Sequence, residues 1–195
     1  MDISEKSQHY ISLENKHGAH NYDPLPVVLS RGEGPLVWDV DGKQYLDFLS
    51  AYSAVNQGHN HPKIVEALNK QAETLCLTSR AFYNDALGPY EKMMTELFGY
   101  DKLLPMNTGA EGVETAIKLA RKWAYQVKGV AENEAIIVTC KNNFHGRTIS
   151  IISYSTDHNA KKEYGPYTPG FEVIEYNDTK ALENKLKEKG KSIAA

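Results

Sequence analysis

The sequence has 195 residues, of which 41% are hydrophobic and 24% charged, a balance typical of a soluble globular protein. The formal net charge is -3 and no long basic run is present, so the composition does not favour nucleic-acid binding. The first residues lack a secretory pattern, and no stretch approaches the roughly 20 apolar residues that span a bilayer. We therefore expect no membrane segment and a cytoplasmic location. Cys76 and Cys140 lie in apolar surroundings without a CxxC partner, which predicts reduced core residues.

The N-terminal part predicts a small antiparallel unit. Residues 17–29, HGAHNYDPLPVVL, contain two prolines and favour an extended segment over a helix. Residues 36–40 and 43–48 alternate apolar and polar positions on either side of Asp41 and Gly42. A two-residue Asp-Gly turn in that setting is a strong hairpin signal.

From about residue 50 the pattern changes to alternating helices and strands. Pro62 begins a predicted helix, and a second helix covers residues 87–98. We expect the apolar positions of both helices to pack inward: Ile64, Val65, Leu68, Ala72 and Leu75 in the first, and Tyr90, Met93, Met94 and Leu97 in the second.

Three short apolar segments are predicted strands: LLPM (103–106), AIIVTC (135–140) and FEVIEY (171–176). A helix from Asp178 or Thr179 to Lys189 follows, and SIAA at 192–195 begins a fourth strand. Strands that alternate with helices indicate an α/β fold with a mainly parallel sheet and helices on both faces, preceded here by the small antiparallel β segment.

The turn NTGAE (107–111) opens a strongly amphipathic helix and has two interpretations. Thr108 and Glu111 fit a capping box, which would satisfy backbone N–H groups of the first helical turn. Small residues at a helix N-terminus also let a phosphate approach the free N–H groups and the positive end of the helix dipole. Taken alone, the turn favours the capping interpretation. The helix it opens presents an inward face and an outer Glu114–Lys118 pair; the face consists of Val113, Ala116, Ile117, Ala120, Ala124 and Val127.

The loop KNNFHGRT (141–148) follows the predicted strand at 135–140. In parallel sheets ligands lie at the carboxyl ends of strands, so this loop and NTGAE are expected to form one site. Phe144 either folds back on the core or offers a face to a planar cofactor. Arg147 is either a solvated charge or a fork for a substrate carboxylate.

Four further residues carry weaker signals. Tyr22 and Tyr52 belong to a set of twelve tyrosines, most of which we expect to be packing residues. His59 and His61 form an HxH pair, but no carboxylate cluster at ligand spacing accompanies it and Pro62 follows directly. A structural role is therefore favoured over a metal site, and we assign no metal.

Five segments together resemble the class III, fold type I, pyridoxal phosphate aminotransferases, and among them the ornithine aminotransferases. The segments are GAHNYDPLPVVL, FLSAYSAVNQGHNHPKI, SRAFYND, LPMNTGAEGVETAIKLARKWAY and NNFHGRT. The resemblance runs from about residue 17 to the end of the chain. The GHxHP and NTGAE-like motifs are shared across the class, whereas the segment around Tyr22 together with SAYSAVNQGH points to the ornithine-specific members.

The resemblance assigns a role to each candidate residue. The Gly109 and Ala110 backbone matches the donors to the cofactor phosphate, with Thr108 beside them. Phe144 matches the aromatic residue that packs against the pyridine ring. Arg147 matches the arginine that holds the α-carboxylate of ornithine, and then a carboxylate of glutamate or 2-oxoglutarate. Tyr22 and Tyr52 match tyrosines that line the substrate pocket, and Tyr22 is nearest the α-amino end.

The implied reaction moves the δ-amino group of L-ornithine to 2-oxoglutarate through pyridoxal 5'-phosphate, giving glutamate 5-semialdehyde and glutamate. The resemblance also implies a homodimer with the cofactor site between subunits. Residues 1–48 would be an N-terminal arm and hairpin belonging to a small domain, and residues 49–195 the first part of the large cofactor-binding domain. The family's Schiff-base lysine is expected beyond Ala195, so we assign no catalytic residue and expect an incomplete, inactive fold.

Alternatives remain open in two directions. An acetylornithine or another ω-amino acid aminotransferase would share the class motifs. A non-catalytic module that binds a phosphate-bearing ligand would use the same turn. A nucleotide-dependent enzyme has little support because neither GxGxxG nor GxxxxGK[ST] occurs.

Overall fold

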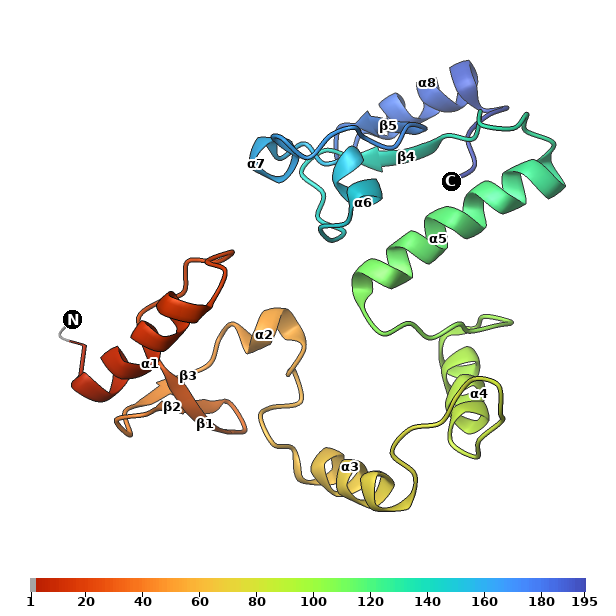
Figure 1. The fold of residues 1–195 in the computed structure, drawn as a ribbon. Coiled ribbons are helices and arrows are strands. Elements are labelled where there is room, and N and C mark those ends of the chain that lie inside the picture. Colours follow the sequence, from red (N-terminus) through yellow and green to blue (C-terminus); the bar gives the residue numbers. More distant parts are fainter. Residues whose placement is uncertain (1–2) are drawn as a thin grey trace. The chain divides into compact units, whose positions relative to one another are not determined.

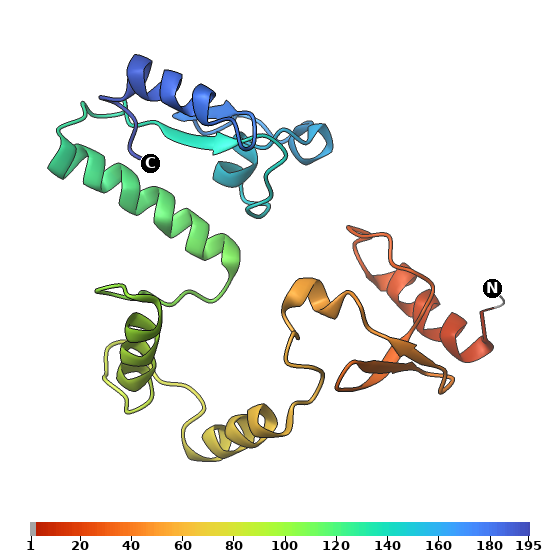
Figure 2. The same cartoon turned by 180° about the vertical axis from the view of Figure 1, so that it is seen from behind.

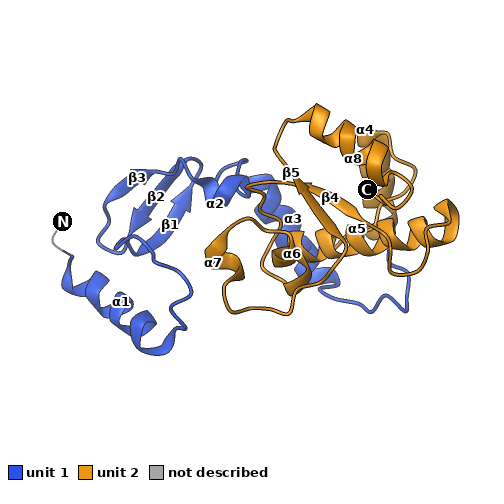
Figure 3. Cartoon of the chain, turned by 90° about the horizontal axis from the view of Figure 1, so that it is seen from above, with its two compact units in different colours: residues 1–84 blue, residues 85–195 orange. Residues whose placement is uncertain are grey.

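The computed structural model describes residues 3–195, whose elements are shown in chain order in Figure 1. The chain divides into two compact units, residues 1–84 and residues 85–195 (Figure 3). Compactness within this chain does not define the family's domains, so the boundary between residues 48 and 49 stays a prediction. Among the described helices, none combines the length and the apolar character that a membrane crossing requires.

The first unit begins with helix α1, Glu5–His17, which the sequence analysis did not predict. The Ser4 side chain caps it by accepting a hydrogen bond from the Ser7 amide at 3.1 Å. The hydroxyls of Ser4 and Ser7 donate to the Asp41 carboxylate at 2.5 and 3.0 Å, which anchors the helix to the hairpin turn. The apolar stripe of α1 is weak, so its periodicity gave little signal.

A three-stranded antiparallel sheet follows in the order β1 (Leu29–Glu33), β2 (Leu36–Asp39) and β3 (Gln44–Leu46). The hairpin prediction is confirmed, and residues 19–28 before β1 form no helix. The predicted two-residue turn is wrong. Trp38 pairs with Gln44, and the Asp39 amide donates to the Lys43 carbonyl at 3.0 Å, so the turn has a third residue, Val40. Gly42 closes the turn with a φ of 83°, which glycine tolerates best.

Hydrogen bonds to one carboxylate stabilise this wider turn. The Asp39 carboxylate accepts the Tyr45 hydroxyl at 2.7 Å and the amides of Asp41 and Lys43 at 3.0 and 2.9 Å. These bonds favour the charged form, so they hold the pKa of Asp39 below its usual value, and the Tyr45 hydroxyl contributes most.

Helices α3 (Pro62–Thr74) and α4 (Leu87–Phe98) lie where the sequence predicts them. We had expected the apolar stripes of both helices to belong to the core, but this prediction is wrong. Leu68 is 66% exposed and Leu97 is 69% exposed. Within its own unit, neither helix makes extensive contacts with another described helix or strand, which explains the exposure of these faces. Cys76, in the segment after α3, is exposed for the same reason, which corrects its assignment to the core.

In the second unit, residues 103–106 are not a strand. A strand needs a hydrogen-bonded partner, and none of the described segments pairs with this one, in which Pro105 also lacks an N–H group. Helix α5 (Gly109–Trp123) continues into the π-helical turn η1 (Ala124–Lys128). We had expected Val127 on the inward face, but its side chain is 69% exposed. The wider π-helical turn rotates this residue away from that face. Ala116 is also exposed.

The sheet of the second unit is parallel, as predicted. Strand β4 (Ile137–Cys140) pairs with β5 (Phe171–Ile174), and Ile193 forms a parallel bridge with Ile136 at the other edge of β4. The predicted strand at 192–195 is therefore represented by this one bridge, which is parallel to β4. Three helices complete the unit: α6 (Ile149–Ser153), α7 (His158–Lys161) and α8 (Thr179–Lys189).

Helices α5 and α8 lie on opposite faces of the β4–β5 pair (Figures 1 and 2). Phe171 and Val173 of β5 pack on the core formed by Ile117 of α5, Ile137, Ile151 and Tyr154. Glu172, between them, points the other way and forms ion pairs with Lys185 and Lys189 of α8. This alternation follows from the two-residue period of a strand and buries one face against α5.

Candidate functional site

The first turn of α5 contains the capping box that the sequence predicts. The Thr108 hydroxyl accepts the Glu111 amide at 3.1 Å, and the Glu111 carboxylate accepts the amides of Asn107 and Thr108 at 2.8 and 3.1 Å. The Gly112 amide donates to the Thr108 carbonyl at 3.1 Å and so begins the helical ladder.

Two amides of this turn are left over, those of Gly109 and Ala110. Neither has an acceptor among the described residues. A Cβ atom built on Gly109 would meet no atom within 4 Å, so the space beside Gly109 is open. Adjacent amides at the positive end of a 15-residue helix suit a phosphate oxyanion. The capping interpretation is confirmed and the phosphate interpretation stays a prediction; the two are compatible because they use different N–H groups.

Gly146 brings the loop at 141–148 against this turn. A Cβ atom at Gly146 would lie 3.0 Å from both Ala110 Cβ and Ile151 Cδ1, and the residue has a φ of 129°. Only glycine allows both the close approach and that backbone conformation. The Thr148 hydroxyl also donates to the Glu114 carboxylate. Glu114 therefore bonds to this loop, whereas the sequence had led us to expect a pair with Lys118. The two predicted site loops are thus adjacent.

Phe144 and Arg147 lie on the exposed side of the loop. Phe144 is 76% exposed, so its ring does not fold back on the core. The Arg147 guanidinium carbon lies 5.9 Å from the centroid of that ring. Asn143 holds the loop, because its amide donates to the Cys140 carbonyl at 2.7 Å and its side-chain oxygen lies 3.1 Å from His145 Nδ1. The ring face is therefore accessible to a planar ligand.

The first unit brings the two predicted tyrosines together. The hydroxyl oxygens of Tyr22 and Tyr52 lie 2.7 Å apart, although 30 residues separate them in sequence. The two rings are 57% and 75% exposed. The two hydroxyl groups thus form a hydrogen-bonded pair on the surface of the first unit.

The His59 ring contacts a carboxylate. Its Nε2 lies 2.7 Å from the Asp47 carboxylate, and within the described chain no three His, Cys, Asp or Glu side chains come together as a metal site. Asp47 is not among the residues predicted from the sequence. Its spacing before Ser50, whose amide it accepts at 2.8 Å, is a capping signal that could have revealed it.

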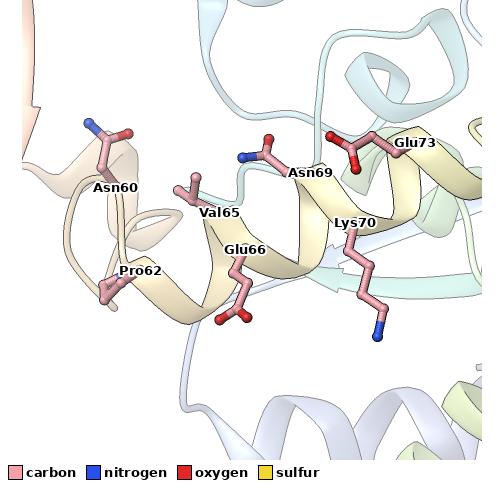
Figure 4. Close-up of a pocket in the computed structure, with 7 residues that line it drawn as sticks. All are labelled: Asn60, Pro62, Val65, Glu66, Asn69, Lys70 and Glu73. Carbon is pink, nitrogen blue, oxygen red and sulfur yellow. The ribbon is translucent and has the colours of Figure 1, made fainter.

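A hollow of about 610 Å³ runs along α3 (Figure 4). Its lining residues are Asn60, Pro62, Val65, Glu66, Asn69, Lys70 and Glu73. Figure 4 shows Asn60 in the loop before α3 and the other side chains spread along the helix, and none of them is a predicted site residue. A ligand site needs convergent polar groups, which this hollow lacks. The candidate functional site therefore remains the first turn of α5 together with the loop at 141–148.

A parallel sheet with unbonded main-chain amides at the start of a covering helix is an arrangement in which α/β proteins commonly bind a phosphate group. Residues 17–195 match the family described as aminotransferase class-III. The chain therefore belongs to the class-III aminotransferases.

Several relatives are named ornithine aminotransferase. The mitochondrial enzyme of Drosophila ananassae is 62% identical over 93% of this chain, which covers 42% of that protein. A crystal structure of the Toxoplasma gondii ME49 ornithine aminotransferase has a TM-score of 0.94 and 47% identity, with 97% of this chain and 44% of that chain covered. The acetylornithine aminotransferase of Elizabethkingia anophelis has a TM-score of 0.84 and 64% identity, with 98% and 46% covered. The chain thus spans less than half the length of these relatives.

Proposed function

We propose that this protein, at its full length, is a pyridoxal-phosphate-dependent ornithine aminotransferase. It would move the δ-amino group of L-ornithine to 2-oxoglutarate and yield glutamate 5-semialdehyde and glutamate. The observation that carries the proposal is the identity shared with the Drosophila ananassae enzyme across nearly the whole chain. The amides of Gly109 and Ala110, which have no acceptor among the described residues, support the phosphate end of the cofactor site.

The residues of the second unit fit pyridoxal phosphate. The Gly109 and Ala110 amides would donate to its phosphate, and Phe144 would pack on its ring. When bound, the cofactor supplies an electron sink for the carbon that loses a proton during amino transfer. In this chain the protein groups bind and orient, and none is proposed to move that proton.

Arg147 would hold the carboxylate of each substrate in turn. A guanidinium binds a carboxylate through two parallel N–H groups and so fixes the direction of the rest of the molecule. With one end fixed, the length of ornithine decides that its δ-carbon reaches the cofactor. The hydroxyls of Tyr22 and Tyr52 would line the pocket near the α-amino group.

Acetylornithine is the competing substrate, because the Elizabethkingia anophelis enzyme shares 64% identity with this chain. An acetyl group on the α-nitrogen removes its charge and adds bulk. We propose that the paired hydroxyls favour the free ammonium group, since they offer oxygen acceptors to it.

The test uses the purified full-length protein loaded with pyridoxal phosphate. L-Ornithine and N-acetylornithine are added separately, and the visible absorbance and the aldehyde product are measured. Bleaching and product with ornithine are expected. A response to N-acetylornithine but not to ornithine would transfer the assignment to the acetylornithine enzymes. No response to either would contradict the aminotransferase proposal.

We also propose a homodimer, which would cover the exposed apolar faces of α3 and α4 with protein. Light scattering of the full-length protein measures this mass directly. A cytoplasmic location stays a prediction, since the Drosophila ananassae and Rattus norvegicus relatives are named mitochondrial, whereas the name of the Oceanobacillus iheyensis relative carries no location.

A further inference from the structure

Helix α2, Ser50–Ser53, is a left-handed turn built without glycine. Ser50, Ala51, Tyr52 and Ser53 have φ angles of 48°, 47°, 57° and 72°. In this region the Cβ of an L-residue crowds the following carbonyl oxygen, so a run of four such residues does not persist on its own. Contacts outside the turn must hold it.

The Asp47 carboxylate provides the first of these contacts. Its Oδ1 accepts the amides of Leu49 and Ser50 at 3.0 and 2.8 Å, so it binds the backbone where the chain enters the turn. The Asp47 amide itself donates to the Pro35 carbonyl at 2.9 Å, which ties Asp47 to the hairpin.

His59 binds the other oxygen of the same carboxylate. Its Nε2 lies 2.7 Å from Asp47 Oδ2, and only 27% and 17% of the two side chains are exposed. The amides bound at Oδ1 and the His59 contact both favour the charged carboxylate, and they lower the pKa of Asp47, with the Ser50 amide the largest cause.

The β1–β2 hairpin fixes His59 in turn. The His59 amide donates to the Gly34 carbonyl at 2.8 Å, and the Gly34 amide donates to the His59 carbonyl at 3.0 Å. A Cβ atom on Gly32 would lie 2.7 Å from His59 Cγ, so a glycine is required beneath the ring. The chain of contacts therefore runs from the sheet through His59 and Asp47 to the left-handed turn.

The turn carries Tyr52, whose hydroxyl meets that of Tyr22 at 2.7 Å. We propose that Asp47 and His59 are positioning residues, which hold the left-handed turn so that Tyr52 presents its hydroxyl beside Tyr22 for recognition of the ornithine α-amino end. This inference rests on the proposed function. It adds that the HxH segment acts on the specificity of the enzyme through a carboxylate and not through a metal.

A double-mutant cycle on the full-length holoenzyme tests the inference. Asp47→Ala removes the link and is expected to lower kcat/KM for ornithine about tenfold, mainly through KM, because Tyr52 is misplaced while the cofactor site is intact. Tyr52→Phe removes the hydroxyl. If Asp47 acts through Tyr52, the double variant is little worse than Tyr52→Phe alone.

Two further variants separate positioning from stability. Asp47→Asn keeps an oxygen for the amides of Leu49 and Ser50 and is expected to recover most of the loss. Asp41→Ala makes the same chemical change in the same unit but removes only the anchor of α1, which is bound through Ser4 and Ser7. It is expected to lower the melting temperature and leave KM for ornithine unchanged.

The inference is overturned if the fold-losses in kcat/KM caused by Asp47→Ala and Tyr52→Phe multiply in the double variant. It is also overturned if Asp47→Ala changes the melting temperature and KM in the same way as Asp41→Ala. If Asp47→Ala does not fold, His59→Gln replaces it in the cycle, since the amides bound to Asp47 then remain. A wild-type enzyme that is inactive with ornithine would overturn the proposed function and this inference together. An active wild type without coupling overturns this inference alone.

Discussion

The hydroxyl oxygen of Tyr22 lies 2.7 Å from that of Tyr52, and the two residues reach this contact from different backbone conformations. Tyr22 lies at a bend in the irregular segment before β1, whereas Tyr52 lies in the left-handed turn α2. Because one hydroxyl donates to the other, removal of either oxygen changes the hydrogen bonding of both.

Substitution of either tyrosine is therefore expected to impair the same step. Tyr22→Phe and Tyr52→Phe should each raise KM for ornithine by roughly three- to tenfold, the effect of losing about one hydrogen bond. Steady-state kinetics of the full-length enzyme with ornithine and with 5-aminopentanoate, which lacks the α-amino group, measures this. Equal losses with both substrates would contradict a role at the α-amino end.

Gly146→Ala is expected to loosen the cofactor site. The added methyl would press on Ala110 and Ile151, and the φ of 129° disfavours alanine, so we expect a loss of about 1–3 kcal/mol in stability and a weaker affinity for pyridoxal phosphate. Chemical denaturation and a cofactor titration measure the two effects. Gly88→Ala in α4 is the matched control, because a Cβ atom there meets nothing within 4 Å. Similar behaviour of the two variants would refute the close contact.

Thr108→Ala should cost about 1 kcal/mol of stability, because the N-cap oxygen that accepts the Glu111 amide is lost. Thr108→Ser keeps an oxygen in the same place and is expected to stay within a few tenths of a kcal/mol of the wild type. Urea unfolding of the full-length protein compares the two. Equal destabilisation by both substitutions would show that the methyl group, and not the cap, matters.

Ala51→Gly should stabilise the protein by about 0.5–1 kcal/mol, because glycine adopts a φ of 47° without a Cβ clash. Ala54, just after the turn, has a right-handed φ of -70° and is the control. Ala54→Gly is expected to be destabilising by a similar amount, because only the entropy of glycine remains. A loss of stability with Ala51→Gly would contradict the left-handed conformation.

Acid should weaken the contact between β5 and α8. Hydrogen bonds from Lys189 and then Lys185 lower the pKa of Glu172 below its unfolded value of 4.5. The unfolded chain therefore takes up the proton first, so the stability that Glu172 contributes is complete above the unfolded pKa and is lost as pH falls through the folded pKa. Glu172→Gln should cost about 1 kcal/mol at neutral pH and progressively less in acid. Urea midpoints measured across this range check the convergence, and a constant difference would refute it.

The sequence predicted most of the second unit correctly because its signals are local. The strands at β4 and β5 are short apolar runs, and Asp178 caps α8 by accepting the Ala181 amide at 2.8 Å. Residues 103–106 have the apolar composition of a strand but no partner strand among the described residues. Whether a segment pairs with another strand cannot be deduced from that segment alone.

The site was only partly predictable. Thr108 and Glu111 carry their capping signal in their spacing, and the resemblance led to Tyr22 and Tyr52. The left-handed turn had no signal, because Ser-Ala-Tyr-Ser contains neither glycine nor asparagine. Its conformation depends on Asp47 and His59, and that dependence is visible only when the hairpin and the turn are seen together.

The leftover amides at the start of α5 have a consequence for how such sites evolve. A pocket that reads its ligand through main-chain N–H groups places little demand on the identity of the residues that supply them, beyond a size limit set by neighbours such as Gly146. If the turn binds phosphate as proposed, substitutions among small residues at 109 and 110 should leave that binding intact. Searches that look for lysine or arginine beside a phosphate would overlook this turn, because the donors proposed here belong to the backbone.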